Sequence, residues 1–225
     1  MAVKATALVA LPFAALLVRR APGARGLTAA VATITAAAAL GYGLLAVPSG
    51  LGVGFVRGLP GSADLVQWTS PPTAFGMTVG YVLRALGIHT DAPVATARAL
   101  GLVLALAIVV TAWWRVGSAG VRQIVVASGL AFAAVALLGP VFYPWYALTP
   151  LALLAVSTSD DRTRAWIGAA TAPLAYLTLP NGIGLAPRTK LPGALAVTAG
   201  FTAAAARRVR RQTRRPPTRP TGTGS

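Results

Sequence analysis

The sequence predicts an all-α fold, a polytopic bundle of about seven transmembrane helices with one short interfacial helix on the outer side of the membrane. Hydrophobic residues make up 56% of the 225 residues, and charged residues make up only 11%. A typical soluble protein has about 25% charged residues, so this chain lacks the charge needed to cover a water-facing surface. The apolar residues also form separate runs of near-membrane length.

Each apolar run is bounded by residues that stop a membrane helix. Arg19 follows the first run and Arg115 the third, while Pro48, Pro140 and Pro180 follow the second, fourth and sixth. A polar turn follows the fifth run and a basic tail follows the seventh. A signal peptide carries its positive charge before its apolar run, so the first run also predicts a membrane helix. The predicted spans are 5–18, 27–47, 97–114, 123–138, 145–156, 165–179 and 191–206.

The segment 48–96, between the second and third spans, is too long for a plain connector. Ser70 is a predicted N-cap, two prolines occupy the first turn after it, and Gly87 is a suitable terminator. We therefore expect a short helix that lies on the membrane surface. Its apolar residues recur at helical spacing, at Phe75, Val79, Val82, Leu83 and Leu86.

The net charge of +16 would suggest nucleic acid as a partner, but its distribution favours a membrane instead. The basic residues are concentrated in alternate loops and in the tail, which predicts a multi-pass plasma-membrane protein with a cytoplasmic carboxyl terminus and segment 48–96 outside. We divide the chain into a membrane module, 1–206, and a disordered basic tail, 207–225, that contacts anionic membrane lipids. The tail arginines are Arg207, Arg208, Arg210, Arg211, Arg214, Arg215 and Arg219.

Catalytic chemistry is tightly restricted by composition. The chain has no cysteine, no glutamate and a single histidine, His89, so we expect neither a metal site nor a cofactor. Any carboxylate mechanism must use one of four aspartates. Asp160 and Asp161 are expected to pair locally in a solvated turn, and Asp91 with His89 to form a turn before a proline. Asp64 is the remaining, weak candidate for a general base.

Two segments on the predicted outer side carry candidate binding residues. The segment 139–146 contains Tyr143, Trp145 and Tyr146, which form either an aromatic belt at the membrane interface or a platform for a lipid-linked sugar. The segment 64–73 brings an acid, an amide, an indole and hydroxyls together, as an ordinary capped loop or as part of a site. Arg84 and Arg98 either extend to the interface or bind a phosphate.

Four stretches, taken in order, resemble a known family. They are KATALVALPFAALL at 4–17, LVQWTSPPTAFGMTVGYVLRALG at 65–87, ARALGLVL at 97–104 and LLGPVFYPWYALTPLALLA at 137–155. In them the chain resembles the carboxyl-terminal half of actinobacterial polyprenol-phosphate-mannose-dependent alpha-1,6-mannosyltransferases, which are membrane glycosyltransferases of the GT-C class. The resemblance covers about residues 2–156, and its most specific parts are the W-T-S-P-P-T and P-W-Y segments.

The resemblance implies transfer of mannose from a polyprenyl-phosphate donor to a lipid-linked glycan on the outer face. Members of this class carry the catalytic aspartate in their first outer loop, so we expect the chain to be truncated or split, and we assign no catalytic base. Family members often have histidine where this chain has Tyr143. The alternative is a non-enzymatic membrane protein, a lipid-linked-sugar transporter or a scaffold partner. The predicted substrate-binding residues are Trp68, Pro71, Pro72, Arg84, Arg98, Trp145 and Tyr146.

Overall fold

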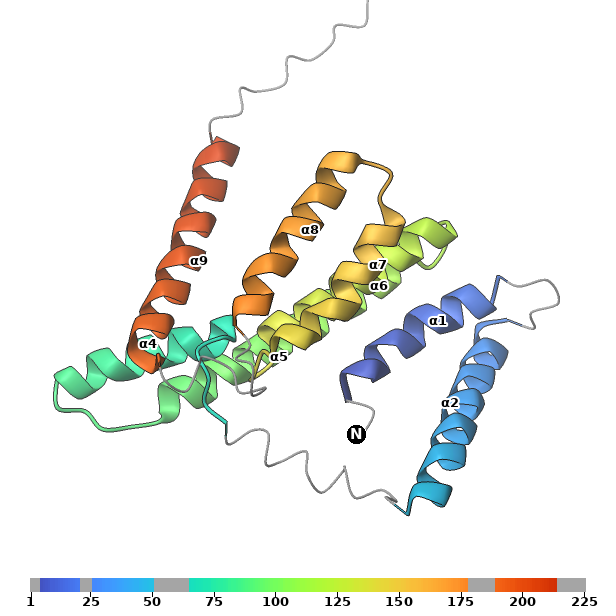
Figure 1. Cartoon of the computed structure of the whole chain (residues 1–225), viewed down its shortest axis with the longest axis horizontal. Helices are drawn as coiled ribbons and strands as arrows, with labels where there is room; N and C mark the ends of the chain where they lie inside the picture. The colour runs from blue at the N-terminus through green and yellow to red at the C-terminus, as the bar shows by residue number, and fades with distance from the viewer. Residues whose placement is uncertain (1–4, 21–25, 51–64, 178–188, 214–225) are drawn as a thin grey trace, which may run out of the picture.

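The structure is a computed structural model that describes residues 5–20, 26–50, 65–177 and 189–213, and over these residues it is helical without any strand (Figure 1). Asp64 lies outside the described residues. The short 3-10 helices are η1 Ala5–Val9 and η3 Pro144–Ala147. The α-helices are α1 Ala10–Val18, α2 Leu27–Ser49, α4 Pro71–Ala85, α5 Ala92–Arg115, α6 Val121–Leu138, α7 Leu148–Ser157, α8 Asp161–Tyr176 and α9 Lys190–Thr213.

Every predicted apolar run corresponds to a helix, and the all-helical prediction is confirmed. Within the described residues, three helices are long and apolar enough to cross a membrane, namely α2, α5 and α6. The stretches Ala7–Val18 and Pro144–Ser157 are apolar but shorter. A helical membrane protein is the class that these helices fit, because their apolar surface needs a lipid environment. The number of about seven crossings stays a prediction.

The helices pack in chain order around α5 and α6. Helix α4 leads into α5, α5 packs against α6, and α6 packs against α7, while α9 crosses α4 (Figure 1). Helix α1 lies on α6, and α2 packs on α1. The contact between α1 and α6 is built from Phe13 and Leu16 of α1 with Ile124 and two small residues, Ala127 and Ala131, of α6. Small residues allow the two helix backbones to approach closely.

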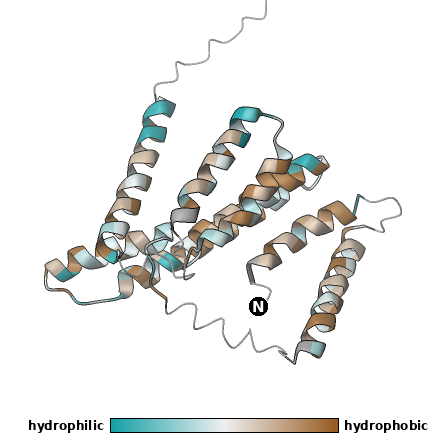
Figure 2. Ribbon diagram, viewed as in Figure 1, coloured by the Kyte–Doolittle hydropathy of each residue, from teal (hydrophilic) through white to brown (hydrophobic). Residues whose placement is uncertain are grey.

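Large apolar side chains cover the outer surfaces of the helices. Leu100 and Leu106 of α5 are 65% and 64% exposed, and Leu44 of α2 is 75% exposed. Strongly hydrophilic residues are instead concentrated at helix ends, most clearly at the upper ends of α8 and α9 in Figure 2. This distribution suits lipid along the helices and water at their ends.

The basic tail begins differently from the prediction. Helix α9 continues without a break from Lys190 to Thr213, so residues 207–213, which were expected to be disordered, are helical. Arg210 and Arg211 lie in its last turn, where positive charge is favourable to the helix dipole. The rest of the tail, 214–225, lies outside the described residues.

Candidate functional site

Helix α4 starts where the sequence predicts, but its first hydroxyl has a different role. Ser70 occupies the N-cap position and Pro71 and Pro72 follow in the first turn, yet the Ser70 side chain makes no capping hydrogen bond. Its hydroxyl donates instead to the carbonyl oxygen of Gly139, at 2.5 Å. The predicted position of the cap is therefore confirmed and its predicted hydrogen bond is wrong.

Three hydroxyls join the start of α4 to the end of α6, and we call this set the hydroxyl clasp. Besides Ser70, the Thr69 hydroxyl donates to the carbonyl of Phe142 and the Thr73 hydroxyl to that of Pro140, both at 2.7 Å. Gly139 is the C-cap of α6, and Pro140 and Phe142 follow it in a segment without regular secondary structure, where carbonyls need partners outside a helix. The clasp supplies partners for these three carbonyls, and it brings together the two segments that the sequence singles out.

The aromatic residues beyond the clasp stack on each other. The rings of Tyr143 and Trp145 are parallel within 7°, with centroids 4.5 Å apart. Tyr146 presents an edge-on contact to both, at 5.5 Å and 6.2 Å. Trp145 remains 38% exposed. The cluster is thus a preformed aromatic surface, which fits both the interfacial belt and the sugar platform.

A pocket of about 430 Å³ lies between α4, α5 and the beginning of α9, and we call it the basic pocket. Arg84, Arg98 and Lys190 line it, together with one carboxylate, Asp91. Arg98 is held firmly, because its Nε donates to the Thr73 hydroxyl at 3.1 Å and a terminal nitrogen donates to the Leu65 carbonyl. Both predicted phosphate-binding arginines therefore line the same pocket.

The other arginine of the basic pocket, Arg84, forms an exposed ion pair with Asp91. A terminal nitrogen of Arg84 lies 3.1 Å from an oxygen of Asp91, and both side chains are mostly exposed. Exposed ion pairs of this kind contribute only about 0–1 kcal/mol, so an incoming anion can compete with Asp91 for Arg84. His89 contacts the Gly87 carbonyl at 3.2 Å. The expected turn before α5 is formed, with Asp91 at its end.

An apolar groove of about 580 Å³ lies on the other face of the α4–α5 pair. Phe75, Val79 and Leu83 line it from α4, and Leu100 and Leu104 line it from α5. Their spacing along α4 places them opposite the residues of the basic pocket. Pro72, a predicted substrate residue, also lines this groove.

Trp68 occupies a different position from the other predicted substrate residues. Its indole nitrogen donates to the Thr189 hydroxyl at 3.1 Å, and its ring lies directly against Gly193 of α9. A β-carbon at residue 193 would be 2.2 Å from the indole ring, so only glycine fits there. The ring thus fixes α9 to the start of α4. It thereby also places Lys190, the first residue of α9, at the basic pocket.

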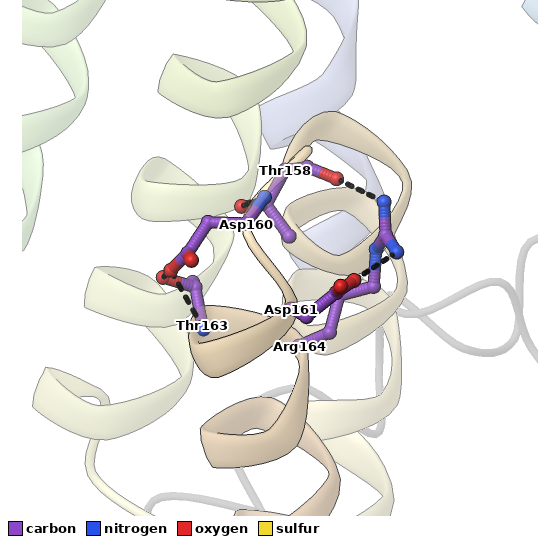
Figure 3. Close-up of polar contacts among 5 residues, drawn as sticks. All are labelled: Thr158, Asp160, Asp161, Thr163 and Arg164. Carbon is purple, nitrogen blue, oxygen red and sulfur yellow. Dashed lines mark hydrogen bonds and ion pairs between the residues drawn. The ribbon is translucent and has the colours of Figure 1, made fainter.

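The paired carboxylates Asp160 and Asp161 form the start of α8, as Figure 3 shows. The Thr163 hydroxyl and backbone nitrogen donate to one Asp160 oxygen, at 2.5 Å and 2.8 Å. Hydrogen bonds to the charged form, first of all from the Thr163 hydroxyl, hold the pKa of Asp160 below its usual value. Asp161 pairs with Arg164 at 2.8 Å. Asp160 therefore caps α8, and Asp161 pairs locally with Arg164 in the exposed first turn of that helix.

Comparison with known proteins identifies related sequences. The family model of the MptB C-terminal domain matches residues 72–208, a range that includes Thr73, Arg84, Arg98, Lys190 and the segment 139–146. Alpha-(1->6)-mannopyranosyltransferase B of Corynebacterium glutamicum is 29% identical over 191 residues, covering 81% of this chain and 32% of that protein.

Two mycobacterial relatives show higher identity over shorter stretches. An alpha-(1->6)-mannopyranosyltransferase of Mycobacterium tuberculosis is 38% identical over 117 residues, covering 48% of this chain and 19% of that protein. A probable alpha-(1->6)-mannopyranosyltransferase of Mycolicibacterium smegmatis is 36% identical over 131 residues, covering 54% of this chain and 23% of that protein. The chain thus spans a third or less of these three relatives. No solved structure matches significantly.

Proposed function

The chain belongs to the MptB C-terminal domain family, and from that membership we propose that it is part of a membrane mannosyltransferase. We further propose that the donor is a polyprenyl-phosphate mannose and that the acceptor is a lipid-linked glycan on the outer face. The basic pocket is the observation that carries this proposal. It gathers three cations around one carboxylate, a combination that suits an anionic phosphate headgroup.

The proposed reaction joins an acceptor hydroxyl to the anomeric carbon of the donor. The bond from that carbon to the phosphate oxygen breaks, the phosphate leaves with the electron pair, and the hydroxyl proton passes to a general base. Arg98 is suited to stabilise the leaving phosphate, because two hydrogen bonds fix its guanidinium before the donor arrives. We assign the base to no described carboxylate, because Asp91 pairs with Arg84, Asp160 caps α8 and Asp161 pairs with Arg164.

Arg98→Gln should weaken donor binding at least tenfold, or about 1.4 kcal/mol. The reason is loss of the charge that faces the phosphate. The donor affinity of Arg98→Lys should lie between those of Arg98→Gln and the unaltered protein, because lysine keeps the charge but lacks the planar guanidinium. The measurement is binding of polyprenyl-phosphate mannose to purified protein in nanodiscs. Arg208→Gln, at the far end of α9, removes the same charge and is the matched control.

A neutral polyprenol, which has the apolar tail of the donor but no phosphate, measures the contribution of the tail to binding by itself. Its affinity should be equal for Arg98→Gln and the unaltered protein, since it has no phosphate. Donor binding that is unchanged in Arg98→Gln would rule out the basic pocket as the phosphate site.

We also propose that the basic pocket faces the outside and the carboxyl terminus the cytoplasm, in a bundle of about seven crossings. The support is the distribution of arginines along the sequence. Since the chain has no cysteine, single introduced cysteines report their side cleanly. In intact cells an impermeant thiol reagent should label His89→Cys, in the exposed α4–α5 turn, but not Ser118→Cys, in the exposed α5–α6 turn. The opposite labelling pattern would show that the protein has the opposite orientation in the membrane.

A further inference from the structure

A third pocket, of about 530 Å³, lies between the end of α5 and the beginning of α6. This is the end of the helix pair away from the hydroxyl clasp, which joins the end of α6. Its walls are largely apolar, with Ile108 on α5 and Val126 and Leu130 on α6. Arg115 and Arg122 line it at the level of the α5–α6 turn. The pocket therefore combines an apolar interior with two guanidinium groups at one end.

The charge of this pocket is unbalanced. None of its lining residues is acidic. Within the described residues, the only hydrogen bond of the Arg122 side chain goes from Nε to the Ser157 carbonyl, at 2.7 Å, and Arg115 is exposed with no acceptor. A third arginine, Arg19, donates to the Gly117 carbonyl in the adjacent turn, at 2.5 Å. Hydrogen bonds thus fix Arg122 and Arg19 at this end, Arg115 remains open to a ligand, and no described carboxylate forms an ion pair with any of the three.

The neighbouring tryptophan indicates the depth of these arginines in the membrane. Trp114 precedes Arg115 and is 78% exposed, whereas Trp113 turns inward and donates to the Pro12 carbonyl at 3.1 Å. Exposed tryptophan is typical of the layer where lipid headgroups lie. Ile108 lies seven residues before Arg115, about 10 Å deeper along the helix. The guanidinium groups are therefore at headgroup depth, and the apolar walls are at acyl-chain depth.

We propose that this pocket binds one anionic phospholipid, with its phosphate against Arg115 and Arg122 and an acyl chain along Ile108, Val126 and Leu130. Basic pockets between transmembrane helices suit anionic headgroups. A phosphatidylcholine would bring its own positive group to the two arginines and cancel much of the attraction. The site is independent of the proposed mannosyl transfer, because it shares no residue with the basic pocket.

Native mass spectrometry of the full chain, purified in detergent and mixed with defined lipids, tests the proposal. The unaltered protein should retain one phosphatidylglycerol and much less phosphatidylcholine. Arg115→Gln/Arg122→Gln should lower phosphatidylglycerol occupancy at least fivefold. Arg115→Gln alone keeps the hydrogen bond to Ser157 and should still lower occupancy, which separates lipid binding from a folding defect. Arg207→Gln/Arg208→Gln removes the same charge from α9 and should retain the lipid.

Three results would overturn the proposal. The first is full phosphatidylglycerol occupancy in the double variant at α5 and α6. The second is equal retention of phosphatidylcholine by the unaltered protein. The third is an equal loss in the α9 control, which would mean diffuse attraction to the basic surface and no built site.

Discussion

Replacing Gly101 by alanine should destabilise the helix bundle by about 1–3 kcal/mol or more, the cost of overpacking a tight contact. Gly101 lies where α5, the first turn of α4 and the end of α6 meet. A β-carbon there would be 2.6 Å from Pro72 Cγ and 2.7 Å from the Leu138 carbonyl oxygen. Neither neighbour is the end of a flexible side chain, because one is a ring and the other is backbone. The helices must therefore separate.

Thermal unfolding of purified protein in nanodiscs measures this effect. Gly200→Ala on α9 is the matched control, since a β-carbon there meets nothing within 4 Å. Alanine is a better helix former than glycine by about 1 kcal/mol, so the control should unfold at the same temperature or higher. If Gly101→Ala unfolded at the same temperature as the unaltered protein, the close contact of three helices at Gly101 would be contradicted.

The second large effect is expected for Thr73→Val, which keeps the side-chain shape and removes the hydroxyl. The Thr73 hydroxyl donates to Pro140 and accepts from Arg98, and the residue is fully buried. Valine removes both hydrogen bonds from a fully buried position, and a lost bond of this kind costs up to about 1–3 kcal/mol. We therefore expect lower stability. We also expect weaker donor binding, because Arg98 loses the hydrogen bond from its Nε that helps to orient it.

Thr202→Val on α9 is the control, because its hydroxyl bonds only to the Thr198 carbonyl on an exposed helix face. It should leave thermal unfolding and donor binding unchanged. The two readouts divide the roles of Thr73. A Thr73→Val variant that unfolds earlier but binds donor normally would restrict Thr73 to the clasp and remove its role in positioning Arg98. Normal unfolding would contradict the clasp itself.

The sequence predicts the helices well because their determinants are local. Apolar runs and the residues that close them give both ends of α2 and α6 and the end of α5 to within two residues, and Ser70 and Gly87 bracket α4. The start of α5 differs, because this helix begins at Ala92, five residues before the predicted span. Local rules also predicted that Ser70 would cap its own helix. In the structure the Ser70 hydroxyl donates to the Gly139 carbonyl at the end of α6, and its oxygen accepts no bond from the first turn of α4. That orientation depends on a segment almost seventy residues away.

The composition of the basic pocket was harder to predict for a similar reason. Arg84 and Arg98 were identified from their unusual outer placement, and they do share the pocket. Lys190 reaches it only because the Trp68 ring packs on Gly193 and bonds to Thr189. A tryptophan in a sequence indicates an aromatic surface, but it does not reveal whether the ring faces a substrate or another helix.

The hydroxyl clasp also has a consequence for the order of events during synthesis. Its donors and acceptors are separated by 67 to 73 residues, while Trp68 and Thr189 are separated by 121. At about 5–20 residues per second, the clasp acceptors are made about 3–15 s after their donors, and Thr189 about 6–24 s after Trp68. A nascent chain can therefore close the clasp and orient Arg98 while Lys190 is still untranslated. The basic pocket is completed last, by α9. A ribosome stalled after the clasp acceptors and before Lys190 would therefore hold a chain with a formed clasp and an incomplete pocket.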